Sequence, residues 1–155
     1  MVTSDTMAAM ANWAGIWADF WHLCVAFALA GTIGWNREEE EHNVGVRSFP
    51  IVAMASCTFV MIASYGGDVA AQSRVLQGLV AGIGFVGGGA ILRDGPTIKG
   101  TATAASVLSA AAIGAAVAMN RFGIALSLTV LNLLALRALM PLKNKLDREP
   151  GRQDH

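Results

Sequence analysis

Charged residues are scarce in this chain: they make up 14% of its 155 residues, against about a quarter in an average soluble domain. The deficit is uneven, because the charges gather in short runs and leave nearly charge-free stretches between them. This pattern is typical of a polytopic membrane protein and argues against a soluble globular domain. Lys plus Arg and Asp plus Glu number eleven each, so no basic surface predicts binding to nucleic acid.

Cysteine and histidine are also sparse, with two and three residues, which argues against catalytic, redox and metal sites built on them. Cys24 and Cys57 both fall in apolar stretches, where we expect reduced packing residues rather than a disulfide. His22, His42 and His155 are scattered, without a metal-spaced pair and without the partners of a nucleophilic triad. We therefore expect neither enzyme activity nor a resident cofactor.

Five apolar stretches approach the length needed to cross a hydrocarbon core of about 30 Å, which takes ~20 helical residues. They cover residues 16–35, 49–65, 75–92, 101–118 and 122–142. The predicted fold class is therefore all-α, a polytopic membrane bundle of five transmembrane helices. A short extracytoplasmic segment (1–15) precedes the five-helix domain (16–142), and a charged tail (143–155), expected to be disordered, follows it.

The positions of Lys and Arg predict the orientation, because these residues stay on the cytoplasmic side of short loops. With the N-terminus outside, the inner segments hold nine cationic residues, and the outer ones hold only Arg74 and Arg121. An odd number of spans then places the C-terminal tail in the cytoplasm. We expect a multi-pass protein whose first partner is the lipid bilayer.

The stretch from Gly78 to Leu92 contains six glycines, although glycine costs about 1 kcal/mol in a helix relative to alanine. On a helical wheel the glycines form two smooth faces, and Leu79, Ile83 and Val86 form a bulky edge between them. We expect this helix to lie between two neighbours, with the bulky edge toward lipid. Small-xxx-small spacing identifies four packing glycines: Gly78, Gly82, Gly84 and Gly88.

The next stretch, 101–118, is the natural neighbour of the glycine-rich helix. Fourteen of its eighteen residues are Ala, Gly, Ser or Thr, so the two helices should form a close hairpin. Packing alone is one interpretation of this composition. The other is a polar cleft between the two helices, lined by hydroxyls: Thr101, Thr103, Ser106 and Ser109.

Two acidic positions near the predicted cytoplasmic face are candidate metal ligands. Glu38 opens a run of four carboxylates, and Asp94 directly follows the glycine-rich stretch. Mg²⁺ favours one or two carboxylates together with retained water, so these side chains could gather the cation. The alternatives are a solvated acidic loop neutralised by Arg37 and Arg47, and a helix-end ion pair at Asp94.

Four motifs, in order along the chain, resemble those of the MgtC/SapB family of bacterial inner-membrane proteins. Their sequences are GTIGWNRE (31–38), GVRS (45–48), GIGFVGGGAIL (82–92) and KGTATAAS (99–106). The likeness covers residues 20–142, and its most specific part is the glycine block followed by the Thr-Ala-Ala-Ser segment. The chain departs from the family pattern at Asn36, where a carboxylate is usual.

This resemblance implies a five-helix domain in the bacterial inner membrane, linked to growth at low Mg²⁺ and, in pathogens, to survival within host cells. The family is labelled as Mg²⁺ transporters, and restraint of the proton-driven ATP synthase is another role attributed to it. By carry-over, ten residues are functional candidates: Arg37, Glu38, Gly45, Arg47, Gly82, Gly84, Gly87, Gly89, Thr103 and Ser106.

Two hypotheses remain open at this point. In the first, the protein serves Mg²⁺ homeostasis and moves the ion through a cleft between 75–92 and 101–118, entered past Glu38 and Asp94. In the second, it transports nothing and its smooth helices dock on another membrane protein, such as the F-type ATP synthase. A homo-oligomer is compatible with both hypotheses.

Overall fold

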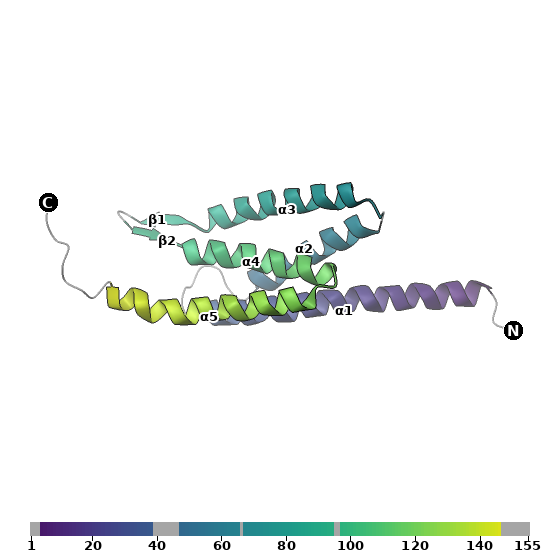
Figure 1. The fold of residues 1–155 in the computed structure, drawn as a ribbon, viewed down its shortest axis with the longest axis horizontal. Coiled ribbons are helices and arrows are strands. Elements are labelled where there is room, and N and C mark those ends of the chain that lie inside the picture. The colour runs from purple at the N-terminus through teal and green to yellow at the C-terminus, as the bar shows by residue number, and fades with distance from the viewer. Residues whose placement is uncertain (1–3, 39–46, 66, 95–96, 147–155) are drawn as a thin grey trace.

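A computed structural model describes residues 4–38, 47–65, 67–94 and 97–146 of the chain. Five helices and one two-stranded hairpin occur in this part, in the order α1–α2–α3–β1–β2–α4–α5 (Figure 1). Their bounds are α1 Ser4–Glu38, α2 Ser48–Ser64, α3 Val69–Gly89, β1 Leu92–Asp94, β2 Thr97–Lys99, α4 Thr101–Ala118 and α5 Phe122–Leu146.

Helix α4 is the centre of the bundle and packs against each of the other four helices. Helix α3 lies on one flank, where it packs mainly against α4 and α2, and α1 and α5 run together on the other flank (Figure 1). The strands β1 and β2 pair antiparallel, with Arg93 opposite Ile98, and join α3 to α4. We call the end of the bundle with this hairpin the hairpin end; the N-terminal part of α1 extends past the opposite end (Figure 1).

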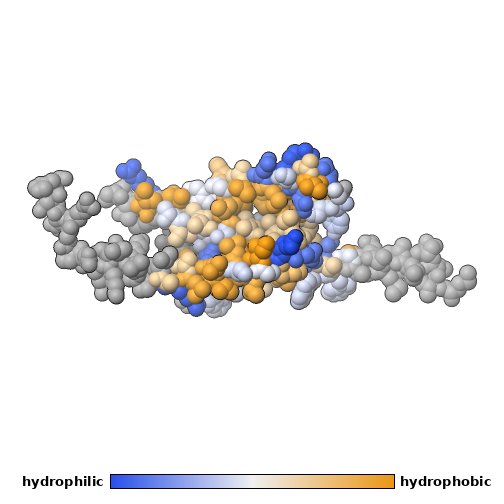
Figure 2. All heavy atoms as spheres, viewed as in Figure 1, coloured by the Kyte–Doolittle hydropathy of each residue, from blue (hydrophilic) through white to orange (hydrophobic). Residues whose placement is uncertain are grey.

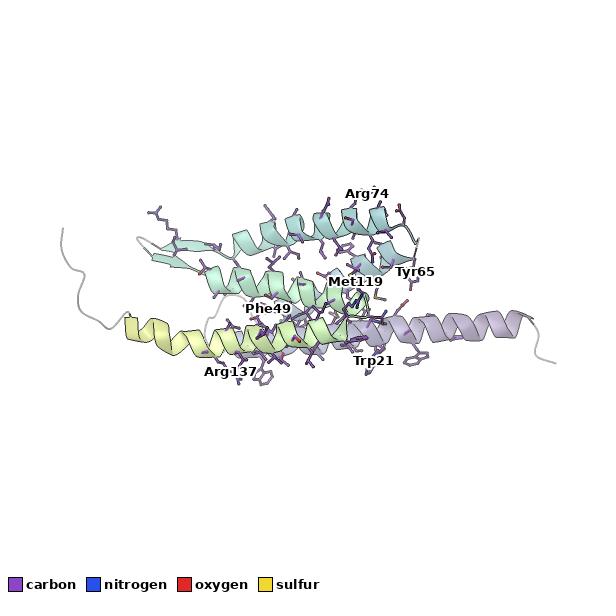
Figure 3. All side chains as sticks on the ribbon, viewed as in Figure 1. Trp21, Phe49, Tyr65, Arg74, Met119 and Arg137 are labelled. Carbon is purple, nitrogen blue, oxygen red and sulfur yellow. The ribbon has the colours of Figure 1, made fainter. Side chains whose placement is uncertain are left out.

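The core consists of small side chains that recur with helical spacing. Ala26, Ala30 and Ile33 are fully buried along one face of α1, as the i, i+4, i+7 pattern requires. Phe49 is the largest fully buried side chain and lies inside the bundle near the start of α2 (Figure 3). More than half of the apolar window of α4 is buried, which small residues permit because helix backbones can then approach closely.

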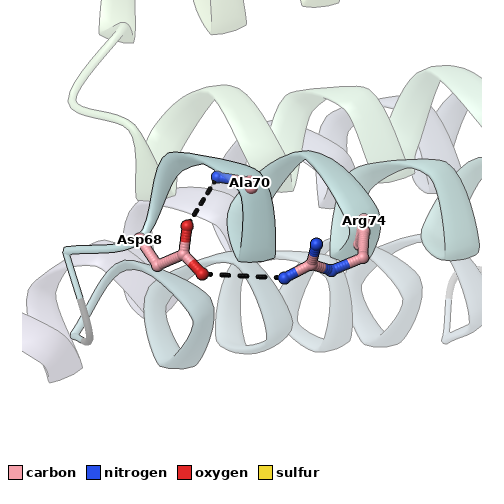
Figure 4. A network of polar contacts seen from close by, with 3 residues as sticks. All are labelled: Asp68, Ala70 and Arg74. Carbon is pink, nitrogen blue, oxygen red and sulfur yellow. Dashed lines mark hydrogen bonds and ion pairs between the residues drawn. The ribbon is translucent and has the colours of Figure 1, made fainter.

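Local capping explains where α3 begins and where α4 ends. The Asp68 side chain accepts a hydrogen bond from the backbone N–H of Ala70 (2.8 Å) and lies 3.6 Å from the Arg74 guanidinium, at the start of α3 (Figure 4). At the end of α4, Asn120 adopts a left-handed φ of 57°. The backbone N–H groups of Asn120 and Arg121 bond to carbonyls of the last turn, which is a Schellman motif.

The number of helices matches the prediction, and the bounds of the fourth, 101–118, match to the residue. The others differ: α1 begins at Ser4 within the predicted extracytoplasmic segment, α3 runs from Val69 to Gly89 rather than over 75–92, and α5 continues to Leu146. The first four residues of the predicted tail are therefore helical, and the rest of it lies outside the described residues. The β1–β2 hairpin was not predicted.

By length and composition, three of the described helices can each cross a membrane: Gly15–Trp35 within α1, Val69–Gly89 and Thr101–Ala118. Helices α2 and the apolar part of α5 are shorter; 17 residues of α2 rise about 26 Å at 1.5 Å per residue. On the face that Figure 2 shows, hydrophobic residues cover much of the middle of the described part, and hydrophilic residues gather mainly toward its ends. The arrangement is that of a multi-pass membrane protein.

Candidate functional site

The connection from α3 to α4 through the β1–β2 hairpin depends on Gly100. This residue has φ 87°, and a Cβ there would lie 2.0 Å from the backbone oxygen of Ala90. Only glycine fits, because any other residue meets both a left-handed backbone and a steric clash. The tight turn brings the Thr-Ala-Ala-Ser segment of α4 alongside the glycine block of α3, as the close-hairpin prediction required.

The face of α3 that meets α4 is the opposite of the predicted one. Leu79 and Ile83 are half-buried; Leu79 faces a small cavity against α4, and Ile83 packs on the core. The prediction that this bulky edge points toward lipid is therefore wrong for both residues, whereas Val86 is 51% exposed. Gly87 is the buried glycine of α3, and a Cβ on it would lie 3.3 Å from the backbone oxygen of Ala104.

The remaining glycines of α3 face away from the described bundle. A Cβ added at any of them would meet no heavy atom of the described chain within 4 Å. The predicted close packing of these glycines against neighbouring helices is therefore not seen among the described residues. We call the five residues the glycine surface: Gly78, Gly82, Gly84, Gly88 and Gly89.

The cavity that the described residues form between α3 and α4 is not the predicted polar cleft. Ser106 is buried and donates its hydroxyl to the Ala102 carbonyl (2.9 Å), and Ser109 donates to Ala105 (3.1 Å). Thr103 is 3% exposed within the bundle, and Thr101 is exposed at the start of α4. The cavity of about 290 Å³ between the two helices has apolar walls apart from Arg121, and none of the four hydroxyls lines it.

The acidic candidates lie at the hairpin end by their place in the chain. Glu38 is the last residue of α1 and Asp94 the last of β1, but their side chains, and that of Arg37, lie outside the described part, as does Gly45 entirely. Among the described residues no group of three His, Cys, Asp or Glu side chains could hold a metal ion. The metal prediction therefore stays a prediction.

The first two family motifs, GTIGWNRE (31–38) and GVRS (45–48), meet where α1 packs against the start of α2. Gly31 and Thr32 of the first motif and Arg47 of the second line a groove of about 790 Å³, together with residues of α5 that include Arg137. A Cβ on Gly31 would lie 3.9 Å from Cγ of Pro50, so the helices are in ordinary contact there. Sequence reasoning missed this groove, because Arg47 and Arg137 are 90 positions apart and share no motif.

A polar cluster joins the helices at the opposite end of the bundle. His22 Nδ1 lies 2.7 Å from the Ala18 carbonyl oxygen, and Nε2 lies 3.0 Å from Asn120 Oδ1 in the α4–α5 turn. The imidazole also stacks on Phe122, with ring centroids 5.7 Å apart. These contacts attach α1 to the turn that ends α4, which indicates a structural role for His22.

One more contact of this cluster joins α1 to the end of α2. The Tyr65 hydroxyl donates to Asp19 at 2.5 Å. Tyr65 and Arg137 lie toward opposite ends of the bundle (Figure 3). The Tyr65–Asp19 contact therefore belongs to the end away from the groove.

Gly114 is a packing residue that the sequence analysis did not identify. A Cβ on Gly114 would lie 2.0 Å from the backbone oxygen of Ala53, so α4 touches the α2 backbone directly at this point. The only signal in the sequence was the smallness of the residues in 101–118, which did not tell this glycine from its alanine neighbours.

Comparison with known proteins agrees with the motifs. The model of the MgtC family matches residues 23–145. The chain is 34% identical to the uncharacterised protein slr0014 of Synechocystis over 83% of its own length and 55% of that protein. It is 34% identical to protein SrpB of Synechococcus elongatus, covering 81% of the chain and 75% of SrpB.

Relatives named protein MgtC are similar to the same region. The one from Salmonella typhimurium is 30% identical over 83% of this chain and 55% of its own length. The chain thus spans about half the length of several curated relatives. No solved structure matches it. The family model covers well over half of the sequence, and the chain belongs to the MgtC family.

Proposed function

We infer that this protein is a non-transporting, non-enzymatic regulator in the bacterial inner membrane that serves adaptation to low Mg²⁺ by docking on another integral membrane protein through the glycine surface. Its orientation in this proposal has the start of α1 outside and the end of α5 in the cytoplasm. The F-type ATP synthase, attributed to the family as a partner, is the first candidate to test.

The observation that carries this proposal is the glycine surface itself. Each glycine in a helix costs about 1 kcal/mol relative to alanine. A Cβ at any of these five would meet no described atom within 4 Å, so packing within the described chain does not require glycine there. None of the most apolar window of α3 is buried, whereas 56% of the window of α4 is. A second helix at the glycine surface would approach the α3 backbone closely, which is how small residues associate helices in lipid.

The described interior gives less support to an ion pathway. Mg²⁺ dehydrates reluctantly and takes oxygen ligands, preferably carboxylates with retained water. The cavity between α3 and α4 is lined mainly by Leu, Ala and Val side chains, and the hydroxyls of Ser106 and Ser109 bond to their own helix. A pathway at this place would have to cross an apolar wall.

Crosslinking in membranes tests the docking proposal. We expect Gly84→Leu and Gly88→Leu to abolish recovery of a crosslinked membrane partner, because each Leu side chain would separate the two helices. Gly123→Leu on α5 is the matched control, since a Cβ at Gly123 also meets nothing within 4 Å. All three variants should keep the helicity and monodispersity of the parent chain, and a partner that stays bound to the α3 variants contradicts the proposal.

Ion flux provides the independent test of the transport alternative. The purified protein is reconstituted in liposomes that hold a Mg²⁺-sensitive dye, and Glu38→Ala is compared with the parent chain. We expect no Mg²⁺ flux from either. Flux from the intact protein that Glu38→Ala removes would overturn the regulator proposal and support a transporter.

A further inference from the structure

The groove between α1, α2 and α5 lies away from the glycine surface. It has a volume of about 790 Å³, within the range of roughly 300–1,000 Å³ that small-molecule sites occupy. No described residue of α3 or α4 lines it. Its described lining consists of Phe27, Ala28, Gly31, Thr32, Trp35, Arg47, Pro50, Ile51, Leu133 and Arg137.

The walls of the groove are apolar and face outward. Phe27, Trp35 and Ile51 are 52%, 70% and 58% exposed, so their side chains are open to whatever surrounds the bundle. The hydroxyl of Thr32 donates to the Leu29 carbonyl at 2.7 Å, so the helix itself uses this donor. In a membrane protein such walls are a surface for acyl chains.

Two arginines give the groove its charge. Arg47 and Arg137 are its only charged side chains among the described lining residues, and both are exposed. A guanidinium is planar, always cationic, and can bind two phosphate oxygens at once. Long cationic side chains also rest their stems on apolar walls while the charged group reaches the interface.

The start of α2 adds to this positive potential. Arg47 is the N-cap residue of α2, no side chain caps the helix there, and its first turn contains no acidic residue. The first backbone N–H groups of a helix favour an anion, because they lack partners within the helix and lie at the positive end of its dipole. Both the helix end and the arginines therefore favour the same charge.

We propose that this groove binds one anionic phospholipid, whose phosphate lies between Arg47 and Arg137 and whose acyl chains lie along Phe27, Trp35 and Ile51. A free inorganic anion would leave the apolar walls unused. A zwitterionic lipid would add a cation beside two arginines. Basic pockets between transmembrane helices bind anionic headgroups for this reason. The proposal stands independently of the glycine surface.

Trp35 makes the binding measurable, because it lines the groove. In a background with Trp13→Phe, Trp17→Phe and Trp21→Phe, Trp35 is the only remaining tryptophan of the chain. The full chain is placed in phosphatidylcholine nanodiscs, and either brominated phosphatidylglycerol or brominated phosphatidylcholine is titrated in as a quencher. The measured quantity is the ratio of the two apparent affinities within one variant, which does not depend on the amount of folded protein.

We expect brominated phosphatidylglycerol to bind about 25-fold more tightly than brominated phosphatidylcholine, about fivefold for each of the two arginines. Each of Arg47→Gln and Arg137→Gln should reduce this ratio about fivefold, the factor for one cationic side chain at an anionic membrane surface, and the double variant should bring it near one. Arg47→Lys and Arg137→Lys should keep most of the preference. Arg74→Gln, at the far end of the bundle, should leave the ratio unchanged.

Four results would overturn the proposal. The first is a ratio near one in the parent chain, which would mean ordinary contact with annular lipid. The second is a preference that the double variant retains, which would place the anion elsewhere. The third is Trp35 fluorescence that neither brominated lipid quenches. This result is expected if a second copy of the chain fills the groove. The fourth is displacement of the lipid by excess inorganic phosphate, which we do not expect and which would indicate a site for the free anion instead.

Discussion

The direct contact between α4 and α2 makes Gly114→Ala the most informative single substitution in this protein. The new Cβ would lie 2.0 Å from the backbone oxygen of Ala53, 2.8 Å from its carbonyl carbon and 3.0 Å from its Cα. Ordinary contact begins at 3.4 Å, so the two helices must separate locally by about 1.4 Å. The opposing atoms belong to a backbone, and no side chain can rotate away.

The size of the effect follows from two opposing terms. Overpacking of this kind costs typically 1–3 kcal/mol, and the rigid backbone places Gly114→Ala at about 3 kcal/mol. Alanine gains about 1 kcal/mol over glycine as a helix former. The difference between the two terms is a net loss of about 2 kcal/mol in the free energy of unfolding.

Gly84→Ala is the matched control, with the same chemical change on a helix where the added Cβ meets nothing within 4 Å. It should raise the stability by about 1 kcal/mol. The assay is titration with sodium dodecyl sulfate in mixed micelles, followed by far-UV circular dichroism. Equal midpoints for the two variants would refute the direct α2–α4 contact on which this reasoning depends.

Four further substitutions test other parts of the fold in the same titration. Gly100→Ala should lower the midpoint, because it combines a φ of 87° with a Cβ 2.0 Å from the Ala90 oxygen; an unchanged midpoint would contradict the described turn. Asn120→Ala should be less stable than Asn120→Gly by about 1 kcal/mol, since only the alanine variant strains the left-handed backbone; equal stabilities would exclude that strain. Asp68→Ala should lose about 1 kcal/mol with the cap of α3, whereas Asp68→Asn keeps the cap and loses only an exposed ion pair; hydrogen exchange at Ala70 separates the two cases. Asn132→Leu should raise the free energy of unfolding by about 1 kcal/mol, because Asn132 is 9% exposed and its amide has no hydrogen bond to the described residues; a fall in the midpoint would reveal a partner for this amide.

The sequence by itself determined the class of the protein and most of its helices. The length of an apolar run sets a membrane span, because the bilayer core has a fixed thickness. Charge-free runs therefore predicted five helices, and the close pairing of the third helix with the fourth followed from small residues on both sides of a short loop. The order of the motifs was enough to indicate the MgtC family, which the family comparison confirmed.

Only the tertiary structure decided which face of each helix points inward. Lipid tails are as apolar as leucine, so hydropathy does not separate the inside of a membrane bundle from its outside. The sequence was compatible with either environment for Leu79 and Ile83 on one side of α3 and for Gly84 on another. In the structure Leu79 and Ile83 are half-buried against the bundle, and Gly84 faces away from it. The meeting of Arg47 with Arg137 at one groove was equally invisible in the sequence, because it arises from the way α2 and α5 pack in three dimensions rather than from any local pattern.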